Sequence, residues 1–350
     1  MHKIFLEGEE KIRRFLKMRN VKKILPRILI LVVFVAALNS GVRYLYEPPT
    51  RNGIYTVNEI KETRGEVETL VLGSSLAHWG VDGNLLGEML DSLTLNLATS
   101  AQPLIGSYYF LKEQSQINPI QRVFLGLHAT TMLRDNNKAL DVRQWIFDRL
   151  VTPLGKLDYL VHTADFTELE QYLLYATRID NLFNIDMVKE NVTYKRGEDY
   201  QNNIPPEDED MTYYGMGNEN TDEVYDGSYD KEKVGKGEYW DRDNVLDISV
   251  EYLEKIALLC QERGIELNIF ITPLTFEYAS IIGDLDDLNQ YFQEFCSAYG
   301  ANLYDAGQIE NVYDLFSNEY FQDYKHLNRT GSELFTSMMG EWYLGLEAES

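Results

Sequence analysis

The sequence contains few cysteines and none of the motifs that mark nucleotide or metal sites. Its two cysteines are Cys260 and Cys296. Each sits on an apolar face of an expected helix, which favours two buried free thiols, although an extracytoplasmic location would permit a disulfide. We find no Walker loop, dinucleotide fingerprint, metal-ligand cluster or internal repeat. We therefore expect neither a cofactor nor a bound metal.

Basic residues are scarce as well. The chain has 32 lysines and arginines against 56 acidic residues, a formal net charge of -24. The first 27 residues are nevertheless net positive, so the rest of the chain is strongly acidic. Such a protein is unsuited by charge to binding nucleic acid or anionic lipid. A polyanionic substrate would need local compensation.

One long apolar run lies near the N-terminus. Every residue from 28 to 38 is apolar, and with its flanks the run reaches the roughly 20 residues that a bilayer requires. Basic residues dominate the segment 1–23, so the positive-inside rule predicts a cytoplasmic N-terminus. We expect a retained single-pass anchor at 24–46 in the cell membrane and an extracytoplasmic domain at 47–350.

A cleaved signal peptide is the alternative to this anchor. Small residues occur at 36–40, but the basic segment is long and no clear cleavage pattern follows the apolar run. No cysteine closely follows the run either, which excludes a lipoprotein.

The rest of the chain has the pattern of an α/β protein. Short apolar segments alternate with helical patterns, which predicts a three-layer sandwich around a mostly parallel five-stranded sheet. The expected strands are 69–72, 93–97, 122–127, 265–272 and 301–304. Ligands of such folds bind at the carboxyl ends of strands, and Ser75, Ser100 and His128 all fall at such ends.

An insertion at about 140–244 interrupts the alternation. Its first half, 144–184, has helical spacing, whereas its second half is polar and rich in tyrosine. From 207 to 230 it contains no lysine or arginine. This composition favours a solvated, poorly ordered loop. The alternative is a flap that contacts a glycan or a membrane partner, since tyrosine rings stack on sugar rings.

The strongest site signal is a serine at the end of the first expected strand. A buried strand that runs into the turn Gly73-Ser74-Ser75 is a way to expose a nucleophile. Near the other end of the chain, Asp323 and His326 sit three residues apart, before a helical stretch. Taken alone, Gly-Ser-Ser after a strand usually indicates a tight turn with a helix N-cap. Asp-x-x-His alone usually indicates a surface histidine and an aspartate that caps the following helix. Together and in this order they predict a triad of Ser75 as nucleophile, His326 as base and Asp323 as orienting carboxylate.

These two motifs resemble the first and last blocks of the SGNH/GDSL hydrolase superfamily, Gly-Asp-Ser-Leu and Asp-x-x-His. The first is represented here by Gly73-Ser74-Ser75-Leu76 and the last by 323–326. The Gly-Ser-Ser variant, followed by 79–82 with the sequence Trp-Gly-Val-Asp, is similar to the membrane-anchored acyl-transfer branch of DltD-like and alginate O-acetylation proteins. The resemblance extends from about residue 68 to about residue 343.

The resemblance implies an O-acyltransferase that works through a serine acyl-enzyme. Its acceptor would be an envelope glycopolymer, such as a teichoic acid that receives D-alanine or a polysaccharide that receives acetyl groups. Its partner would be a multi-pass membrane-bound O-acyltransferase. Two alternatives remain: an envelope carbohydrate esterase of the same fold, and a non-catalytic scaffold of a polymer-modification complex.

The middle blocks of the superfamily match less well. The second block normally holds a glycine and the third an asparagine, and both bind the oxyanion. The region 96–102 lacks glycine, so the N–H of Ser100 or Ala101 would act beside that of Ser75. The third region has no asparagine; His128 could reach the site, although a strand-end histidine is more often structural. His78 is a competing base that we expect to line the mouth of the site.

Overall fold

The computed structural model describes residues 21–50, 53–206, 208, 211–228 and 237–349 of the 350-residue chain. The chain divides into two compact units. One, which we call the helical unit, comprises the chain up to Pro48 together with Thr167–Glu198. The other, the sheet unit, comprises Pro49–Phe166 and Asp199–Ser350. Part of the sequence that we expected as an insertion into the sheet domain is therefore grouped with the N-terminal helix.

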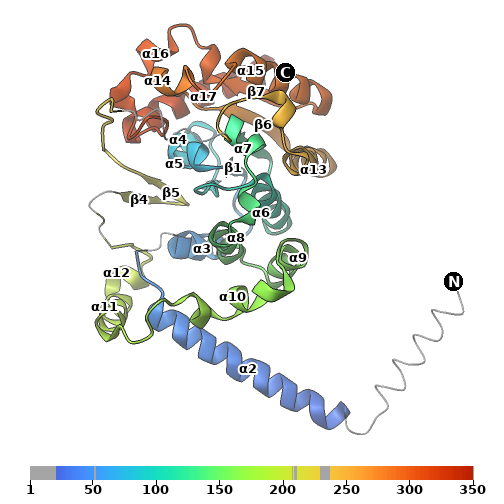
Figure 1. The fold of residues 1–350 in the computed structure, drawn as a ribbon, viewed down its shortest axis with the longest axis vertical. Helices are drawn as coiled ribbons and strands as arrows, with labels where there is room; N and C mark the ends of the chain where they lie inside the picture. The colour runs from blue at the N-terminus through green and yellow to red at the C-terminus, as the bar shows by residue number, and fades with distance from the viewer. Residues whose placement is uncertain (1–20, 51–52, 207, 209–210, 229–236, 350) are drawn as a thin grey trace, which may run out of the picture. The chain divides into compact units, whose positions relative to one another are not determined.

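A parallel five-stranded sheet forms the centre of the sheet unit (Figure 1). Its order is β2-β1-β3-β6-β7, and every neighbouring pair is parallel. The α/β class and the five strands are thus confirmed, with each strand boundary within one residue of its expected position. The strands are β1 (Thr69–Gly73), β2 (Thr94–Asn96), β3 (Arg122–Gly126), β6 (Glu266–Ile271) and β7 (Asn302–Asp305).

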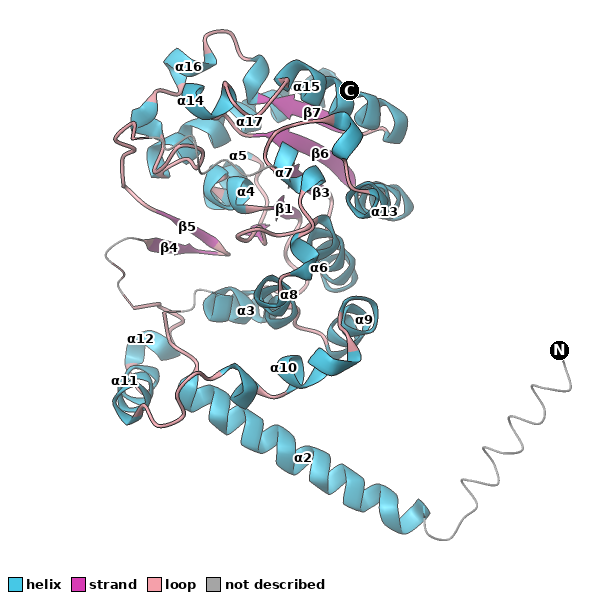
Figure 2. Ribbon diagram, viewed as in Figure 1, coloured by secondary structure: helices cyan, strands magenta, loops and turns pink. Residues whose placement is uncertain are grey.

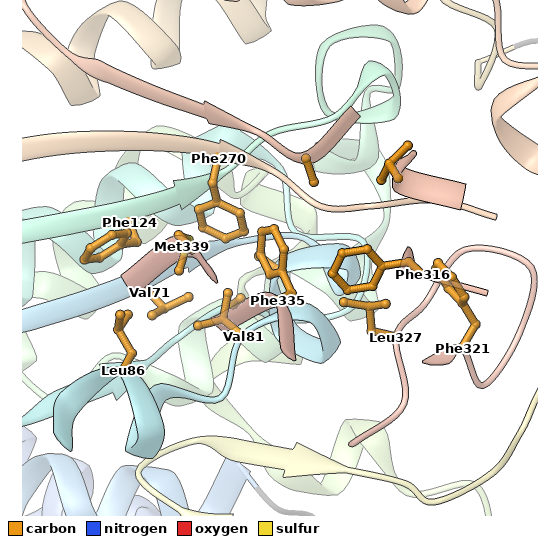
Figure 3. Packing of buried hydrophobic residues seen from close by; sticks show 14 of the residues in the cluster. Val71, Val81, Leu86, Phe124, Phe270, Phe316, Phe321, Leu327, Phe335 and Met339 are labelled. Atoms are coloured by element: carbon orange, nitrogen blue, oxygen red, sulfur yellow. The ribbon is translucent and has the colours of Figure 1, made fainter. Parts of the chain in front are cut away.

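Both faces of this sheet are buried, which explains the uninterrupted apolar runs in the sequence. Val71, Phe124 and Phe270 lie on one face and pack with Phe335 and Met339 in a single core cluster (Figure 3). Successive side chains of a strand point to opposite faces. The residues one position earlier, at 70, 123 and 269, are also fully buried, so the second face is covered as well.

Helices on the two faces follow from the strand order, because parallel crossovers are right-handed. On one face, α17 packs against α4 and α5. The helices α6 and α13 pack against each other, and they contact β1 and β6, respectively (Figure 2). The longer helices of the sheet unit are α3 (Gly53–Glu62), α5 (Gly83–Met89), α6 (Leu104–Ile117), α8 (Leu140–Arg149), α9 (Pro153–Thr163), α13 (Asp247–Arg263), α15 (Leu285–Tyr299) and α17 (Arg329–Glu349). The short ones are α4 (Ser75–Gly80), α7 (Ala129–Leu133), α14 (Phe276–Ala279) and α16 (Val312–Leu315).

The cysteines lie on two of these helices, as expected. Cys260 on α13 and Cys296 on α15 are both buried free thiols. Burial raises the pKa of each thiol to about 12. Both side chains therefore stay protonated and unreactive at neutral pH.

The polar second half of the insertion is more ordered than its composition predicts. An antiparallel hairpin of β4 (Thr212–Gly215) and β5 (Asn218–Asn220) replaces the expected poorly ordered loop within 211–228. The hairpin is held because its polar side chains find partners on neighbouring helices: the Tyr213 hydroxyl donates to Glu59, and Asn218 Oδ1 accepts from the N–H of Gly83. The parts of the loop at 207, 209–210 and 229–236 lie outside the described residues.

The helical unit contains α2 (Val21–Tyr46), α10 (Leu169–Leu173) and α11 (Ile185–Lys195), and α12 (Glu198–Gln201) follows it in the chain. Within α2, the stretch Ile24–Tyr46 is long and apolar enough to cross a membrane, with a mean hydropathy of 2.0. This confirms one apolar helix suited to a single anchor. The cytoplasmic location of the N-terminus stays a prediction, and the basic residues before Val21 lie outside the described part of the chain.

Candidate active site

Ser75 is placed by a turn that only glycine permits. Gly73 ends β1 with φ +141°, and a Cβ there would lie 2.7 Å from Ala77 Cβ and 2.8 Å from the Gly126 carbonyl oxygen. The chain can therefore turn directly from the buried strand into α4, whose first residue is Ser75. Ser74 occupies the N-cap position, but its side chain makes no capping hydrogen bond with any residue that the structure describes.

The structure brings together the three residues that the end motifs predicted. His326 Nε2 lies 2.8 Å from Ser75 Oγ, and His326 Nδ1 lies 2.7 Å from Asp323 Oδ2. Both separations are hydrogen-bonding distances. With Nδ1–H donating to the carboxylate, Nε2 is the nitrogen that can accept the serine proton. Ser75 and His326 are 251 positions apart in the chain.

Asp323 has two tasks in this arrangement. Its Oδ1 accepts the backbone N–H groups of Lys325 and His326, each at 2.8 Å, while its Oδ2 faces the imidazole. Burial by itself would raise the pKa of Asp323. The hydrogen bonds and the charge of His326, with the two backbone donors, outweigh burial and lower that pKa below its usual value. Asp323 therefore remains ionised beside the imidazole at neutral pH.

The loop that bears Asp323 and His326 is fixed at its base by Asn328. The Asn328 side-chain amide donates to the carbonyls of Glu319 at 2.7 Å and Glu223 at 3.1 Å, and its Oδ1 accepts the Gly331 N–H at 3.0 Å. Leu327, the residue before it, is buried in the core cluster. A buried anchor directly after His326 holds the imidazole in place, so Asn328 is a positioning residue whose role the sequence did not reveal.

His78, the competing base, points to a different partner. Its Nε2 lies 2.6 Å from Glu219 Oε1, on β5 of the hairpin. The side chain of Asn220, which ends β5, donates to the Trp79 carbonyl at 3.3 Å. The hairpin thus contacts α4 through two hydrogen bonds. One of them engages His78, the histidine that could have competed with His326. Glu219 was missed because its acidic, tyrosine-rich surroundings have no motif.

His128 ends β3 at the same edge of the sheet but has no hydrogen bond to Ser75. It is the N-cap of α7, where its Nδ1 accepts the Thr130 N–H at 3.4 Å. Its Nε2 is buried and has no partner among the described residues. Burial, with the charges of Lys325 and His326, lowers the pKa of His128 to about 3. The side chain is therefore neutral, and its proton resides on Nε2 as an unused donor.

The second-block residues lie beside the start of α4. The Thr99 N–H donates to the Gly73 carbonyl at 3.2 Å, so the turn at Ser100 and Ala101 directly follows the contact with β1. Ala101 has φ +55°, a left-handed conformation that glycine adopts more easily. Within the described ranges, the N–H groups of Ser100 and Ala101 have no hydrogen-bond partner. Both remain available as donors.

Glu238 is a buried carboxylate that lies near two cations, one of them on the Asp323–His326 loop. Glu238, which is buried, accepts from Arg134 at 2.6 Å and from the Tyr278 hydroxyl at 2.6 Å. Lys325 Nζ lies 4.0 Å from the same carboxylate. This acid compensates Arg134 and Lys325, the residue before His326, and it too comes from the insertion without a sequence signal.

A pocket of about 670 Å³ lies next to the hairpin rather than over Ser75. Glu219, the partner of His78, is one of its lining residues. The Tyr214 ring faces it with the Arg329 guanidinium 4.9 Å above the ring centre. Its other polar lining residues include Asp82, Asn84, Glu88, Asn218, Asn220, Tyr320 and Glu333. Carboxylates outnumber the one cation, so the pocket suits a neutral, hydroxyl-rich ligand better than an anion.

No protein-family model matches this chain. The comparison with curated proteins likewise gives no match. Among the residues that the structure describes, no three histidine, cysteine, aspartate or glutamate side chains are grouped so as to hold a metal ion.

Proposed function

We propose that this protein is a membrane-anchored serine acyltransferase related to the SGNH hydrolases. The observation that carries the proposal is the hydrogen-bonded series from Ser75 Oγ through His326 to Asp323. The strand order β2-β1-β3-β6-β7 supports it. From β1 the chain adds β2 on one side and, later, β3 on the other, and parallel α/β proteins bind ligands between the two strands where the order switches. Ser75 follows β1, and His128 follows β3.

The geometry supports a two-step acyl transfer. Ser75 Oγ attacks the carbonyl carbon of an activated acyl donor while its proton passes to His326 Nε2. The same proton then protonates the leaving group as its bond to the acyl carbon breaks, which leaves an acyl ester on Ser75. In the second step an acceptor hydroxyl gives its proton to Nε2 and attacks that ester. The bond between Ser75 Oγ and the acyl carbon then breaks, and Oγ takes the proton back from Nε2. Asp323 stabilises the imidazolium in both steps without itself taking the proton.

The oxyanion formed in each step needs donors. The main-chain candidates are the Ser75 N–H at the start of α4 and the N–H groups of Ser100 and Ala101, which have no partner among the described residues. The His128 Nε2–H is a side-chain candidate, since the ring is neutral and this nitrogen is buried without a partner in the described part of the chain. A donor of this kind contributes about 10²–10³-fold in rate in enzymes that use one.

An envelope glycopolymer is the acceptor class that we favour over water. The apolar helix α2 would keep the acyl-enzyme at the membrane surface, where proximity to an envelope polymer raises the effective concentration of its hydroxyls. The pocket beside Glu219 offers tyrosine and amide side chains that suit a sugar unit of such a polymer. A multi-pass membrane-bound O-acyltransferase would supply the acyl group. An esterase remains the alternative, because water competes for the same acyl-enzyme.

Covalent labelling tests the nucleophile. We expect a fluorophosphonate probe to label the full-length protein in detergent, Ser75→Ala to abolish labelling, and Ser74→Ala to retain it. The adjacent serine is the matched control, because its side chain makes no hydrogen bond to a histidine or carboxylate that the structure describes. Labelling that persists in Ser75→Ala, or a folded wild-type protein that is never labelled, would favour a non-catalytic scaffold.

The acyl content of the envelope separates transferase from esterase. For a transferase, deletion of the gene and Ser75→Ala both lower the acyl content of the acceptor polymer; for an esterase they raise it. Tyr214→Ala sharpens the acceptor assignment: we expect lower envelope acylation with an unchanged rate of probe labelling. Equal loss of both would mean that Tyr214 supports the fold rather than the acceptor.

A further inference from the structure

The segment Thr167–Glu198 of the helical unit exposes large apolar side chains in two places. Phe183 is 89% exposed, and its neighbours Leu182 and Ile185 are 49% and 64% exposed. Leu173 and Leu174, at the end of α10, are 54% and 36% exposed. Single apolar side chains are common on protein surfaces, but two groups of them within one short segment indicate an interaction surface.

Both groups are attached to the last turns of α2. The Tyr175 N–H, directly after Leu174, donates to Asn39 Oδ1 at 2.6 Å. The Tyr46 hydroxyl donates to the Leu182 carbonyl at 2.6 Å. Since an α-helix rises 1.5 Å per residue, Asn39 and Tyr46 are about 10 Å apart along the axis. The apolar groups are therefore held beside the final two turns of the apolar helix.

Residues at the C-terminal end of Thr167–Glu198 bond the last carbonyls of α2. The side chain of Asn191 donates to the Leu45 carbonyl at 3.1 Å, and Lys195 Nζ donates to the carbonyls of Tyr44 and Glu47 at 2.8 and 2.5 Å. A lysine at this position satisfies terminal carbonyls and complements the negative end of the helix dipole. Asn191 and Lys195 are buried. The segment is thus fixed to α2 at several points.

These contacts coincide with the boundary that a bilayer would impose. A hydrocarbon core of about 30 Å takes roughly 20 helical residues, so a span that begins at Ile24 ends near Arg43. Arg43 pairs with Glu47 at 2.7 Å and lies 5.9 Å from the centre of the Tyr175 ring. Tyrosines and a paired arginine at this depth are typical of the membrane–water interface.

We propose that Thr167–Glu198 is a membrane-interface surface whose exposed apolar side chains insert into the lipid leaflet at the C-terminal end of α2. The occupant is the bilayer itself, because the surface is continuous with the apolar helix. Acidic residues outnumber basic ones within the segment, so insertion is hydrophobic and needs no anionic headgroup. The polar outer side of α11, with Asp186, Lys189 and Thr193, remains in water.

Depth-sensitive fluorescence tests this surface in the full-length protein. Phe183→Cys is labelled with an environment-sensitive fluorophore and reconstituted into phosphatidylcholine vesicles that contain lipids with a nitroxide high on the acyl chain. The wild-type protein sets the background, because both native thiols are buried. Thr193→Cys is the matched control on the polar side of the same segment, and Leu173→Cys reports from the second apolar group.

We expect blue-shifted emission from the labels at 183 and 173, with at least half of it quenched by the nitroxide lipid, and water-like, unquenched emission from the label at 193. High salt should leave the quenching unchanged. Water-like emission at both 183 and 173 would overturn the proposal. Blue-shifted emission that lipid nitroxide does not quench would also overturn it, because the surface would then be covered by protein. Quenching that disappears in high salt would contradict hydrophobic insertion.

Discussion

Two histidines lie at the same edge of the sheet and have opposite surroundings. His326, in the loop before α17, is hydrogen-bonded on both ring nitrogens, to Ser75 and to Asp323. His128, at the end of β3, is almost wholly buried, and its pKa is lowered to about 3. Among the described residues its ring hydrogen-bonds only Thr130, at the start of α7. An ionised carboxylate thus equips one imidazole to gain a proton, whereas burial keeps the other neutral.

The difference shows that the role of a histidine depends on its partners more than on its position. His128 lies between β3 and α7, and His326 lies in the loop before α17. Only His326 has a carboxylate on the far nitrogen, which is the arrangement that a general base requires. His128 instead has a buried Nε2–H, which can donate but cannot accept. In the mechanism that we propose, His326 would carry the proton and His128 would donate a hydrogen bond.

The largest expected effect comes from removal of the proton carrier. His326→Ala should lower the rate of fluorophosphonate labelling of Ser75 by about 10³-fold or more, because an unassisted serine hydroxyl is a weak nucleophile. In the envelope-acylation assay, Ser75→Ala combined with His326→Ala should be no worse than Ser75→Ala alone, since the two act as a unit. Additive losses there would mean that His326 acts elsewhere and that His78 or His128 is the base.

A somewhat smaller loss is expected from Asp323→Asn, which should slow labelling by about 10²–10⁴-fold while the protein still folds. Asparagine keeps an oxygen for the two backbone N–H groups of the loop. Its amide would then face His326 Nδ1 and favour the tautomer with the proton on Nε2, which cannot accept from Ser75. Labelling rates combined with thermal unfolding distinguish this from loss of the loop. A variant that keeps near-normal labelling would show that Asp323 is structural only.

His78→Gln and His326→Gln form a matched pair that tests the choice of base. We expect His78→Gln to label within about tenfold of the wild type, since glutamine can still bond Glu219 and the substituted side chain takes no proton from Ser75. His326→Gln should lose labelling almost completely. The reverse ranking would assign the base to His78 and leave His326 as a loop residue.

The smallest effect concerns His128 and appears in the pH dependence of stability. Its folded pKa, about 3, lies below its ordinary value, so between about pH 6.5 and 3 the unfolded chain binds a proton that the folded chain does not. Stability should fall on acidification through this window, by at most about 1.4 kcal/mol per pH unit from this group. His128→Gln should flatten the fall in thermal unfolding of the detergent-solubilised protein.

Asp323 supplies the control for that experiment. Its pKa is lowered on folding, so its contribution is present above its ordinary pKa and is lost only as the pH drops further, through the folded value. The fall below about pH 4 should therefore persist in His128→Gln. An unchanged slope above pH 4 would show that His128 is not buried in its neutral form.

Much of the fold could be predicted because its signals are local. Uninterrupted apolar runs identified all five strands, and the apolar stretch that ends at Tyr46 identified α2. The hairpin at 212–220 could not be predicted, since its stability depends on Tyr213 and Asn218 reaching α3 and the start of α5. The attachment of Thr167–Glu198 to α2 was equally hidden, because single hydrogen bonds such as Asn191 to the Leu45 carbonyl have no sequence pattern.

The sequence by itself determined the strands, the apolar helix and the glycine turn before Ser75, because each depends on residues that are neighbours in the chain. It also supplied Asp323 and His326 at the spacing that lets one loop hold both. Only the tertiary structure decided which histidine meets Ser75, since that contact spans 251 positions and His78 is diverted to Glu219. Burial decided that His128 stays neutral. Packing between distant segments sets both outcomes, and local sequence does not encode it.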